Sequence, residues 1–285
     1  MIPASFDYVR PASAAEAVSA LAAAGEDGKV LAGGQSLLPI LRLRLAYPET
    51  VIDLGGIDEL VGVTDDGDAI RIGAMTTHSD VLHDPLVAEH APLLAQATRT
   101  VADRQVRHRG TFGGSLAHAD PAGDLPAVAL ALNAELRVLG PSGERTVPAA
   151  EFFVDYLTTS LAADEILTAI RIPKLGPGWS THYEKLNRVA QAWSIVAVAA
   201  AVHRADGTIT EARIGLTNMG PTPLRALAVE QALAGVEAAE PAVRAASAHA
   251  AEGTSAPSDL SGRADYREHL ATVLTRRAVL TAAGI

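Results

Sequence analysis

Two short stretches rich in glycine and hydroxyl residues are the parts of this sequence best suited to binding chemistry. The first, residues 32–37, reads A-G-G-Q-S-L, and the second, residues 111–115, reads T-F-G-G-S. Glycine has no Cβ, so the backbone beside it can approach a ligand closely, and successive amides can form a concavity that binds anions. We therefore expect the two stretches to hold one diphosphate between them with their backbone N–H groups.

Ten residues are predicted to form this diphosphate site. They are Ala32, Gly33, Gly34, Gln35, Ser36, Leu37, Thr111, Gly113, Gly114 and Ser115. Asp124 follows the second stretch and is an acceptor-only carboxylate, which suits the hydroxyl groups of a sugar. It also stands at the expected start of a helix, where an acidic side chain can cap or stabilise the first turn, so a structural role is the alternative.

The sequence has no motif for hydrolytic, metal-dependent or thiol chemistry. Ser36 and Ser115 lack the G-x-S-x-G context of a hydrolase nucleophile, and the nine histidines show no H-E-x-x-H or comparable ligand spacing. No G-x-G-x-x-G follows a predicted strand, so the dinucleotide fingerprint of a Rossmann fold is missing. The chain has no cysteine, which excludes disulfides, a thiolate nucleophile, a cysteinyl-flavin link and cysteine-ligated iron–sulfur clusters on this polypeptide.

Composition describes a globular chain that is not built for nucleic acid. Hydrophobic residues make up 48% of the 285 residues, which allows a large core, and the formal charge is −10. Nucleic acid needs basic patches, so this charge disfavours it as a partner. The sequence has no apolar run long enough to span a bilayer and no signal-peptide pattern at its start. We expect a cytoplasmic protein that is not an integral membrane protein.

The elements that must position these motifs follow from turn and periodicity signals. Ser13, with Glu16 three residues later, predicts a capped helix that ends near Gly25. Short strands are expected after it, at 30–32 and 51–54, which gives a β-α-β unit over residues 1–54. The turn at 65–68 predicts a hairpin, and glycine and proline at 175–178 predict a linker. In residues 55–175 we further expect helices at 93–103 and 124–133 and strands at 135–139 and 165–173.

Beyond the linker, the Asp206-Gly207 turn predicts a hairpin. The flanking run at 194–204 is rich in alanine and valine and could be read as helix, but the turn favours a strand. We expect strands at 181–186, 194–204 and 208–216, and helices at 223–234, 240–252 and 266–283. The predicted class of this part is α+β.

The two stretches, with their continuations A-G-G-Q-S-L-L-P and T-F-G-G-S-L-A-H-A-D-P-A-G-D-L-P, resemble the FAD pyrophosphate loops of the molybdenum hydroxylase flavoproteins. This is the xanthine dehydrogenase and aerobic carbon monoxide dehydrogenase family, and the resemblance runs from Phe6 to the C-terminus. It implies an α+β chain. Residues 1–175 would form two small α/β subdomains of the vanillyl-alcohol-oxidase-type FAD fold, divided near residue 54, and residues 176–285 a C-terminal antiparallel sheet with helices.

The resemblance also assigns residues outside the two stretches. It places Asp124 at the ribose of FAD, the Leu167 backbone near the flavin, Lys185 in contact with the cofactor and Trp193 over one flavin face. The alternatives are a buried strand leucine, a solvated strand lysine and a core tryptophan. Val101 departs from the pattern, because some relatives have phenylalanine there.

The resemblance implies an electron-transfer subunit with non-covalent FAD and no catalytic residue of its own. A small [2Fe–2S] subunit and a large molybdenum-cofactor subunit would be its partners, in a dimer of heterotrimers. Carbon monoxide is the first candidate substrate of the complex, and an N-heterocycle or aldehyde is the second. A quinone-type acceptor is expected in preference to NAD⁺, because an indole over the flavin would occupy the nicotinamide position. Peripheral association with the inner membrane face is an alternative to a free cytoplasmic complex.

Two other classes of protein remain open from the sequence. One is a stand-alone flavin oxidase, for which 285 residues leave little room for a substrate domain. The other is a non-catalytic nucleotide-binding or assembly protein. Bound flavin would distinguish either flavoenzyme from a non-catalytic protein. Co-purifying partner subunits would distinguish the electron-transfer subunit from a stand-alone oxidase.

Overall fold

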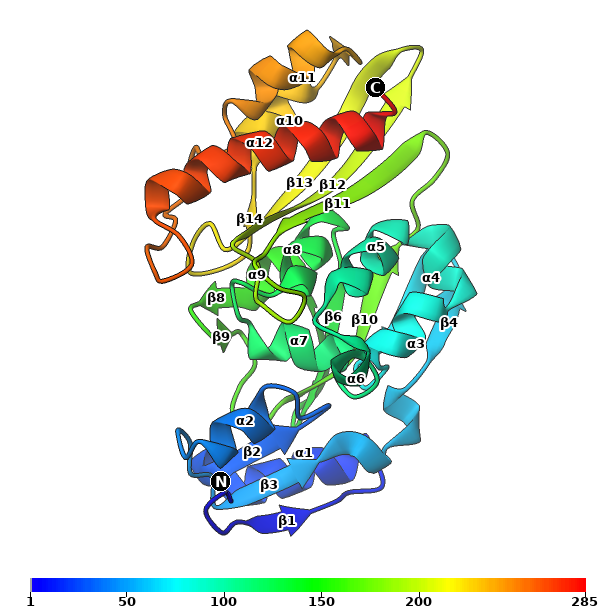
Figure 1. Cartoon of the computed structure of the whole chain (residues 1–285). Coiled ribbons are helices and arrows are strands. Elements are labelled where there is room, and N and C mark those ends of the chain that lie inside the picture. Colours follow the sequence, from blue (N-terminus) through cyan, green and yellow to red (C-terminus); the bar gives the residue numbers. More distant parts are fainter. Residues whose placement is uncertain (1) are drawn as a thin grey trace.

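The computed structural model of the protein describes residues 2–285, arranged as three stacked layers of sheet and helix. Figure 1 shows the N-terminal part in blue at one end, the central part in cyan and green, and the C-terminal part in yellow to red at the other end. The α+β class predicted from the sequence is what the structure shows. Among the described residues, no helix is both long and apolar enough to cross a membrane.

The N-terminal layer is a small parallel sheet with the order β1 (Asp7–Val9), β3 (Thr50–Asp53), β2 (Gly28–Leu31). Helix α1 (Ala14–Ala24) begins where the sequence predicts, because the Ser13 hydroxyl accepts from the Glu16 N–H at 3.2 Å. Three short 3₁₀ turns lie in this layer, η1 (Gly25–Asp27), η2 (Leu54–Gly56) and η3 (Asp58–Leu60). Helix α2 (Leu37–Arg42) directly follows the first glycine stretch.

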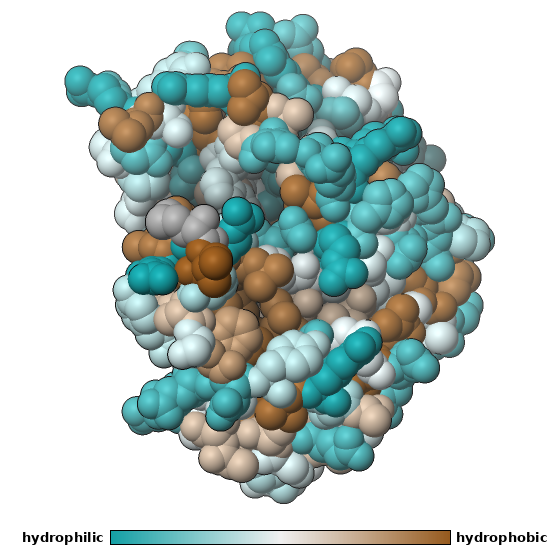
Figure 2. Space-filling model, turned by 60° about the horizontal axis from the view of Figure 1, so that its bottom comes forward, coloured by the Kyte–Doolittle hydropathy of each residue, from teal (hydrophilic) through white to brown (hydrophobic). Residues whose placement is uncertain are grey.

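The surface of this layer carries exposed apolar side chains on and after α2. Leu38, Leu43, Leu45 and Tyr47 are all at least 40% exposed. Figure 2, which turns this end of the molecule forward, shows brown apolar side chains gathered among teal polar ones. Contiguous exposed apolar side chains of this kind mark surfaces that bind something.

The central layer is an antiparallel sheet with short helices. Its strand order is β4 (Val63–Asp66), β5 (Ala69–Gly73), β10 (Ile166–Pro173), β6 (Glu135–Gly140), β7 (Gly143–Pro148). The helices are α3 (His78–His83), α4 (Pro85–His90), α5 (Pro92–Thr100), α6 (Arg104–Arg107), α7 (Phe112–His118), α8 (Asp124–Ala131) and α9 (Ala149–Phe152), with a small hairpin of β8 (Phe153–Asp155) and β9 (Thr158–Thr159). All eight residues of α8 are buried, so this helix forms the centre of the molecule.

The second glycine stretch is the start of a helix. Phe112, Gly113 and Gly114 form the first turn of α7. Thr111 caps that helix by accepting the Gly114 N–H on its hydroxyl at 3.1 Å. Two glycines disfavour helix by about 1 kcal/mol each, and here the cap and close packing outweigh that cost.

The C-terminal layer is an antiparallel sheet of β11 (Trp179–Leu186), β12 (Val196–Ala205), β13 (Thr208–Thr217) and β14 (Leu224–Arg225), with β15 (Val236–Glu237) beside β13. Helices α10 (Leu227–Leu233), α11 (Glu240–Ser247) and α12 (Ala264–Ala283) cover its outer face (Figure 1). Strand β12 has two buried faces, because successive side chains alternate. Ala197, Ala199 and Ala201 join the core of the central layer, while Val196 and its alternate neighbours pack under the helices. Alanine on the inner face lets this sheet approach α8 and α5 closely.

Candidate functional site

The two glycine stretches lie against each other, although nearly eighty positions separate them in the sequence. A Cβ placed on Gly33 would lie 2.7 Å from the Gly110 Cα and would overlap the Arg109 carbonyl oxygen. A Cβ on Gly114 would lie 3.1 Å from the Ala32 Cβ. The close approach of residues 109–110 requires glycine at position 33, whereas Gly114 is confined mainly by the Thr111 hydroxyl of its own stretch, at 2.6 Å. The two stretches meet at the junction of the N-terminal and central layers.

The first stretch supplies the free hydrogen-bond donors of this site. In the described part of the chain, the N–H groups of residues 33–36 donate to no backbone acceptor. Gly34 has φ +75°, a conformation that favours glycine. Consecutive unpaired N–H groups around such a residue are suited to binding the oxygens of an anion.

The second stretch uses its own N–H groups within the protein. The Phe112 N–H donates to the Thr76 carbonyl at 3.0 Å and the Gly113 N–H to the Ala74 carbonyl at 2.9 Å. The Gly114 N–H is taken by Thr111. The two stretches therefore play different parts: the first offers backbone donors, and the second offers close packing and the hydroxyl groups of Thr111 and Ser115.

Ala74 connects the second stretch to the strand that carries Leu167. The Ala74 N–H donates to the Thr168 carbonyl at 2.9 Å, at a point where β10 shifts register against β6. Leu167 itself is buried in the core of the central layer. The structure thus brings the backbone of residues 167–168 beside the start of α7, while the leucine side chain packs as a core residue.

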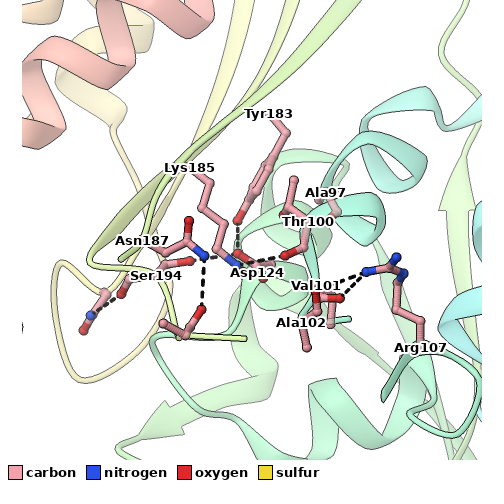
Figure 3. A network of polar contacts seen from close by, with 12 residues as sticks. Ala97, Thr100, Val101, Ala102, Arg107, Asp124, Tyr183, Lys185, Asn187 and Ser194 are labelled. Carbon is pink, nitrogen blue, oxygen red and sulfur yellow. Dashed lines mark hydrogen bonds and ion pairs between the residues drawn. The ribbon is translucent and has the colours of Figure 1, made fainter. Parts of the chain in front are cut away.

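A buried polar network centres on Asp124 (Figure 3). Its Oδ1 accepts from the Tyr183 hydroxyl at 2.6 Å and from the Ser194 hydroxyl at 2.8 Å. Its Oδ2 accepts from the Lys185 ammonium at 2.7 Å, which also donates to the Thr100 carbonyl at 3.2 Å. The side chains of Lys185 and Asp124 are only 5% and 6% exposed. Asp124 is therefore a structural hub inside the protein, and Lys185 is not a solvated strand lysine.

Tyr183 is a permanent donor in this network. Burial, followed by the neighbouring Asp124 charge, raises its pKa well above the usual value. Its phenol therefore keeps the proton that it donates to Asp124 over the range in which proteins are studied. A carboxylate that accepts several such bonds is stabilised in its charged form.

Two cavities open on either side of this network. One, of about 430 Å³, is lined by Lys185, Tyr183, Thr100 and their neighbours, and is called the Lys185 cavity below. The other, of about 820 Å³, is lined by Trp193, Ser194, Asn218 and residues of the α7–α8 connection, and is called the Trp193 cavity. Both have volumes that suit a small organic ligand or part of a larger one.

Trp193 is a surface residue, 54% exposed, which excludes the core alternative. Its ring lies 6.5 Å from the ring of His118 at the end of α7. Gln191 in the same connection between β11 and β12 hydrogen bonds to Asp103. The connection that carries Trp193 therefore spans from the C-terminal sheet to the segments on both sides of the second glycine stretch.

Tyr183, Ser194 and Asn218 belong to the site but were missed in the sequence. Asn218 donates to the Ser194 carbonyl at 2.8 Å and holds it in place. Tyr183 could have been found, because it stands two residues before Lys185 on the same face of a predicted strand. Ser194 and Asn218 carried no such signal, since the contacts of Ser194 with Asp124 and of Asn218 with Ser194 join distant segments. Val101, where the family pattern is broken, is partly buried against the central core.

Comparison with known proteins identifies the family. Residues 4–175 match the FAD binding domain in molybdopterin dehydrogenase, and residues 181–282 match the CO dehydrogenase flavoprotein C-terminal domain. The chain belongs to the flavoprotein family of the molybdopterin dehydrogenases. Membership confirms the resemblance seen in the two glycine stretches and makes the chain an FAD-binding subunit of an oxidoreductase.

Members of the flavoprotein family match along nearly their full length. The carbon monoxide dehydrogenase medium chain of Hydrogenophaga pseudoflava is 41% identical over 98% of this chain and 97% of its own. The nicotine 6-hydroxylase medium subunit of Paenarthrobacter nicotinovorans is also 41% identical, over 96% of each chain. A structure of the Hydrogenophaga carbon monoxide dehydrogenase superposes with a TM-score of 0.97 and 44% identity, covering 100% of this chain and 99% of that one.

The residues present fit FAD. Free N–H groups at 33–36 suit its diphosphate, and the Gly33 and Gly114 positions are kept clear of side chains at the contact between the stretches. Within residues 2–285 no cluster of histidine and acidic side chains is arranged to hold a metal ion. The first glycine stretch thus offers an anion site formed by backbone N–H groups.

Proposed function

We propose that this chain carries non-covalent FAD and passes electrons from the [2Fe–2S] clusters of a partner subunit to an external acceptor. The observation that carries the proposal is the contact between the two glycine stretches, with unpaired N–H groups at 33–36. FAD, when bound, supplies the redox chemistry itself, and the protein supplies binding and electrostatics. The site residues proposed from the sequence remain the candidates for this binding, with the first stretch as the source of the backbone donors.

Lys185 is proposed to tune the cofactor. An ammonium has three donors, and Asp124 and Thr100 take two of them. The third is available at the wall of the Lys185 cavity. A cation held there favours negative charge on a bound flavin.

Asp124 is proposed to act mainly through Lys185. Three of the roughly four lone-pair sites of its carboxylate are occupied by protein donors. The ribose contact expected from the sequence stays a prediction, and one acceptor site is left for it. Asp124 does not cap α8 with its side chain, but it does stand in the first turn of that helix, as the structural alternative expected.

The partners are proposed to be a small [2Fe–2S] subunit and a large molybdenum-cofactor subunit, in a dimer of heterotrimers. The relatives are medium chains or subunits, a name that implies larger and smaller companions. The absence of cysteine from the sequence requires that cysteine-ligated clusters lie on another chain. The exposed apolar side chains on and after α2 are the kind of surface that a subunit contact covers.

Carbon monoxide is the proposed substrate of the complex, with an N-heterocycle or aldehyde as the alternative. Identity does not decide between them, because a carbon monoxide dehydrogenase chain and a nicotine hydroxylase chain are equally similar to this one. The deciding residues belong to the large subunit, since the described chain offers no metal site.

A quinone-type acceptor is proposed rather than NAD⁺. The exposed Trp193 stands where an indole can cover a flavin face. The side chains that line the Trp193 cavity in the described structure include no lysine or arginine to pair with a second diphosphate. Neutral carriers need no such pairing. A cytoplasmic complex, or one held peripherally at the inner membrane face, is compatible with this acceptor.

Co-purification tests the proposal. The full chain is tagged and purified from its native cells, and the captured complex is analysed for FAD, iron and molybdenum. We expect all three, with oxidation of carbon monoxide and reoxidation of the reduced complex by a quinone faster than by NAD⁺. A flavoprotein that turns over alone with oxygen would indicate a stand-alone oxidase, and a chain without flavin would indicate a non-catalytic binding protein.

A further inference from the structure

The Asp124 network forms a continuous bridge between the two cavities. Tyr183 and Lys185 line the Lys185 cavity, and Ser194 lines the Trp193 cavity. Asp124 lines neither, yet it binds all three of these side chains. A change of hydrogen bonding on one side of Asp124 is therefore transmitted to the other side through a single carboxylate.

The two oxygens of the Asp124 carboxylate bind different kinds of donor. Two neutral hydroxyl donors share Oδ1, and the charged donor has Oδ2 to itself. Both hydroxyl donors are fixed, since Tyr183 and Ser194 are buried and Asn218 anchors the Ser194 backbone. Buried networks of this kind hold one arrangement when every member is satisfied.

The hydroxyl donors fix the orientation of the Asp124 carboxylate, and that carboxylate binds the Lys185 ammonium. A hydrogen bond weakens steeply as its geometry departs from linear. Each hydroxyl that donates to Asp124 therefore restricts the orientation of the carboxylate. The position of the ammonium at the Lys185 cavity thus depends on Tyr183, which lines that cavity, and on Ser194, which lines the other one.

We propose that Tyr183 and Ser194 are positioning residues for the flavin reaction: they hold the Asp124 carboxylate in one orientation, and thereby fix the ammonium of Lys185 at the cavity wall. The inference rests on the proposed binding of FAD. It assigns to the two hydroxyl groups an effect on the redox properties of the bound cofactor, in addition to their contribution to stability. No proton or electron is transferred to Tyr183 or Ser194 in this role.

The test is the midpoint potential of FAD bound to the full chain, in Tyr183→Phe, Ser194→Ala and the double variant. Loss of one hydroxyl weakens the stabilisation of negative charge on the reduced cofactor about tenfold, which lowers the potential by about 30 mV for a two-electron couple. Spectroelectrochemical titration at several pH values measures this shift, and also the pH at which the reduced cofactor takes up its proton. That pH should rise by about one unit.

Two control variants distinguish a positioning role of the hydroxyl groups from a purely structural role. Ser180→Ala removes an exposed hydroxyl from the same strand, β11, and should leave the potential unchanged. Ser194→Thr keeps a hydroxyl at the network and should restore most of the wild-type potential. If Ser194→Ala does not fold, Tyr183→Phe decides alone, because it removes one oxygen and keeps the ring.

The experiment distinguishes failure of this inference from failure of the proposed function. A wild-type chain that binds no FAD contradicts the proposed function. Variants that bind FAD with unchanged potential and unchanged pH dependence overturn the positioning role, even though FAD binding stands. A shift of equal size in Ser180→Ala overturns it as well.

Discussion

Lys185 and Asp124 form a buried ion pair at 2.7 Å that joins the C-terminal sheet to the first turn of α8. The pair links two layers of the molecule, so it serves both the fold and the candidate site. Three side chains donate to the Asp124 carboxylate, so the pair belongs to a larger buried network.

We expect Asp124→Asn to destabilise the chain strongly, since it leaves the Lys185 charge buried without a partner. Removal of one member of such a pair costs about 3–5 kcal/mol. The combined Asp124→Asn and Lys185→Met variant should recover part of that loss, because no buried charge then remains. Urea unfolding of each variant measures the difference.

The exposed pair of Glu240 and Arg244 is the matched control, with side chains 57% and 64% exposed. Glu240→Gln should change the free energy of unfolding by less than about 0.5 kcal/mol. Equal losses at the buried and exposed pairs would show that Asp124 is not the hub described above.

Gly33→Ala should weaken FAD binding and destabilise the contact between the glycine stretches. Its Cβ would overlap the Arg109 carbonyl oxygen, so one stretch must move away from the other. Overpacking of this kind costs about 1–3 kcal/mol. Thermal unfolding and FAD titration of the full chain measure both effects.

Gly176→Ala is the control for this substitution. Gly176 has no positive φ, and a Cβ there would meet nothing within 4 Å. It should leave both stability and FAD affinity unchanged. Wild-type FAD affinity in Gly33→Ala would show that the contact between the stretches is not needed for binding.

His78 makes stability depend on pH between about 4 and 6.5. Burial, with a smaller contribution from the Arg107 charge, lowers its pKa from 6.5 to about 4. The unfolded chain therefore binds this proton at a higher pH than the folded chain does. Stability from this group is complete above pH 6.5 and is lost as the pH falls to about 4, by about 3 kcal/mol in total.

Urea unfolding of wild type and His78→Phe across this range tests the dependence. The variant should lose less stability on acidification than wild type does. Exposed His269→Gln should retain the wild-type profile. Parallel profiles for wild type and His78→Phe would contradict the assignment.

Sequence reasoning succeeded where a local signal was strong. The Asp206-Gly207 turn identified β12 as a strand although its alanine and valine residues also suit a helix, and the pairing of β12 with β13 confirms it. The Ser13 cap likewise located the start of α1. Both features depend on residues close together in the chain, so no tertiary information was needed.

The rest of the site depends on contacts that the sequence does not display. Tyr183, Lys185 and Ser194 are 59, 61 and 70 positions from Asp124, and only folding brings them together. The helical start of α7 was missed for a related reason, since tertiary packing overrides the low helix propensity of Gly113 and Gly114. Resemblance to a family supplied Lys185, but not the hydroxyl groups that hold its partner.

FAD content of the purified full chain tests the central claim most directly. Absorbance and released flavin are compared for wild type and Gly33→Val after both have been shown to fold by circular dichroism. We expect about one tightly bound FAD per wild-type chain and almost none in the variant, because the larger side chain separates the two glycine stretches. A folded Gly33→Val chain that retains FAD as tightly as wild type would contradict the account.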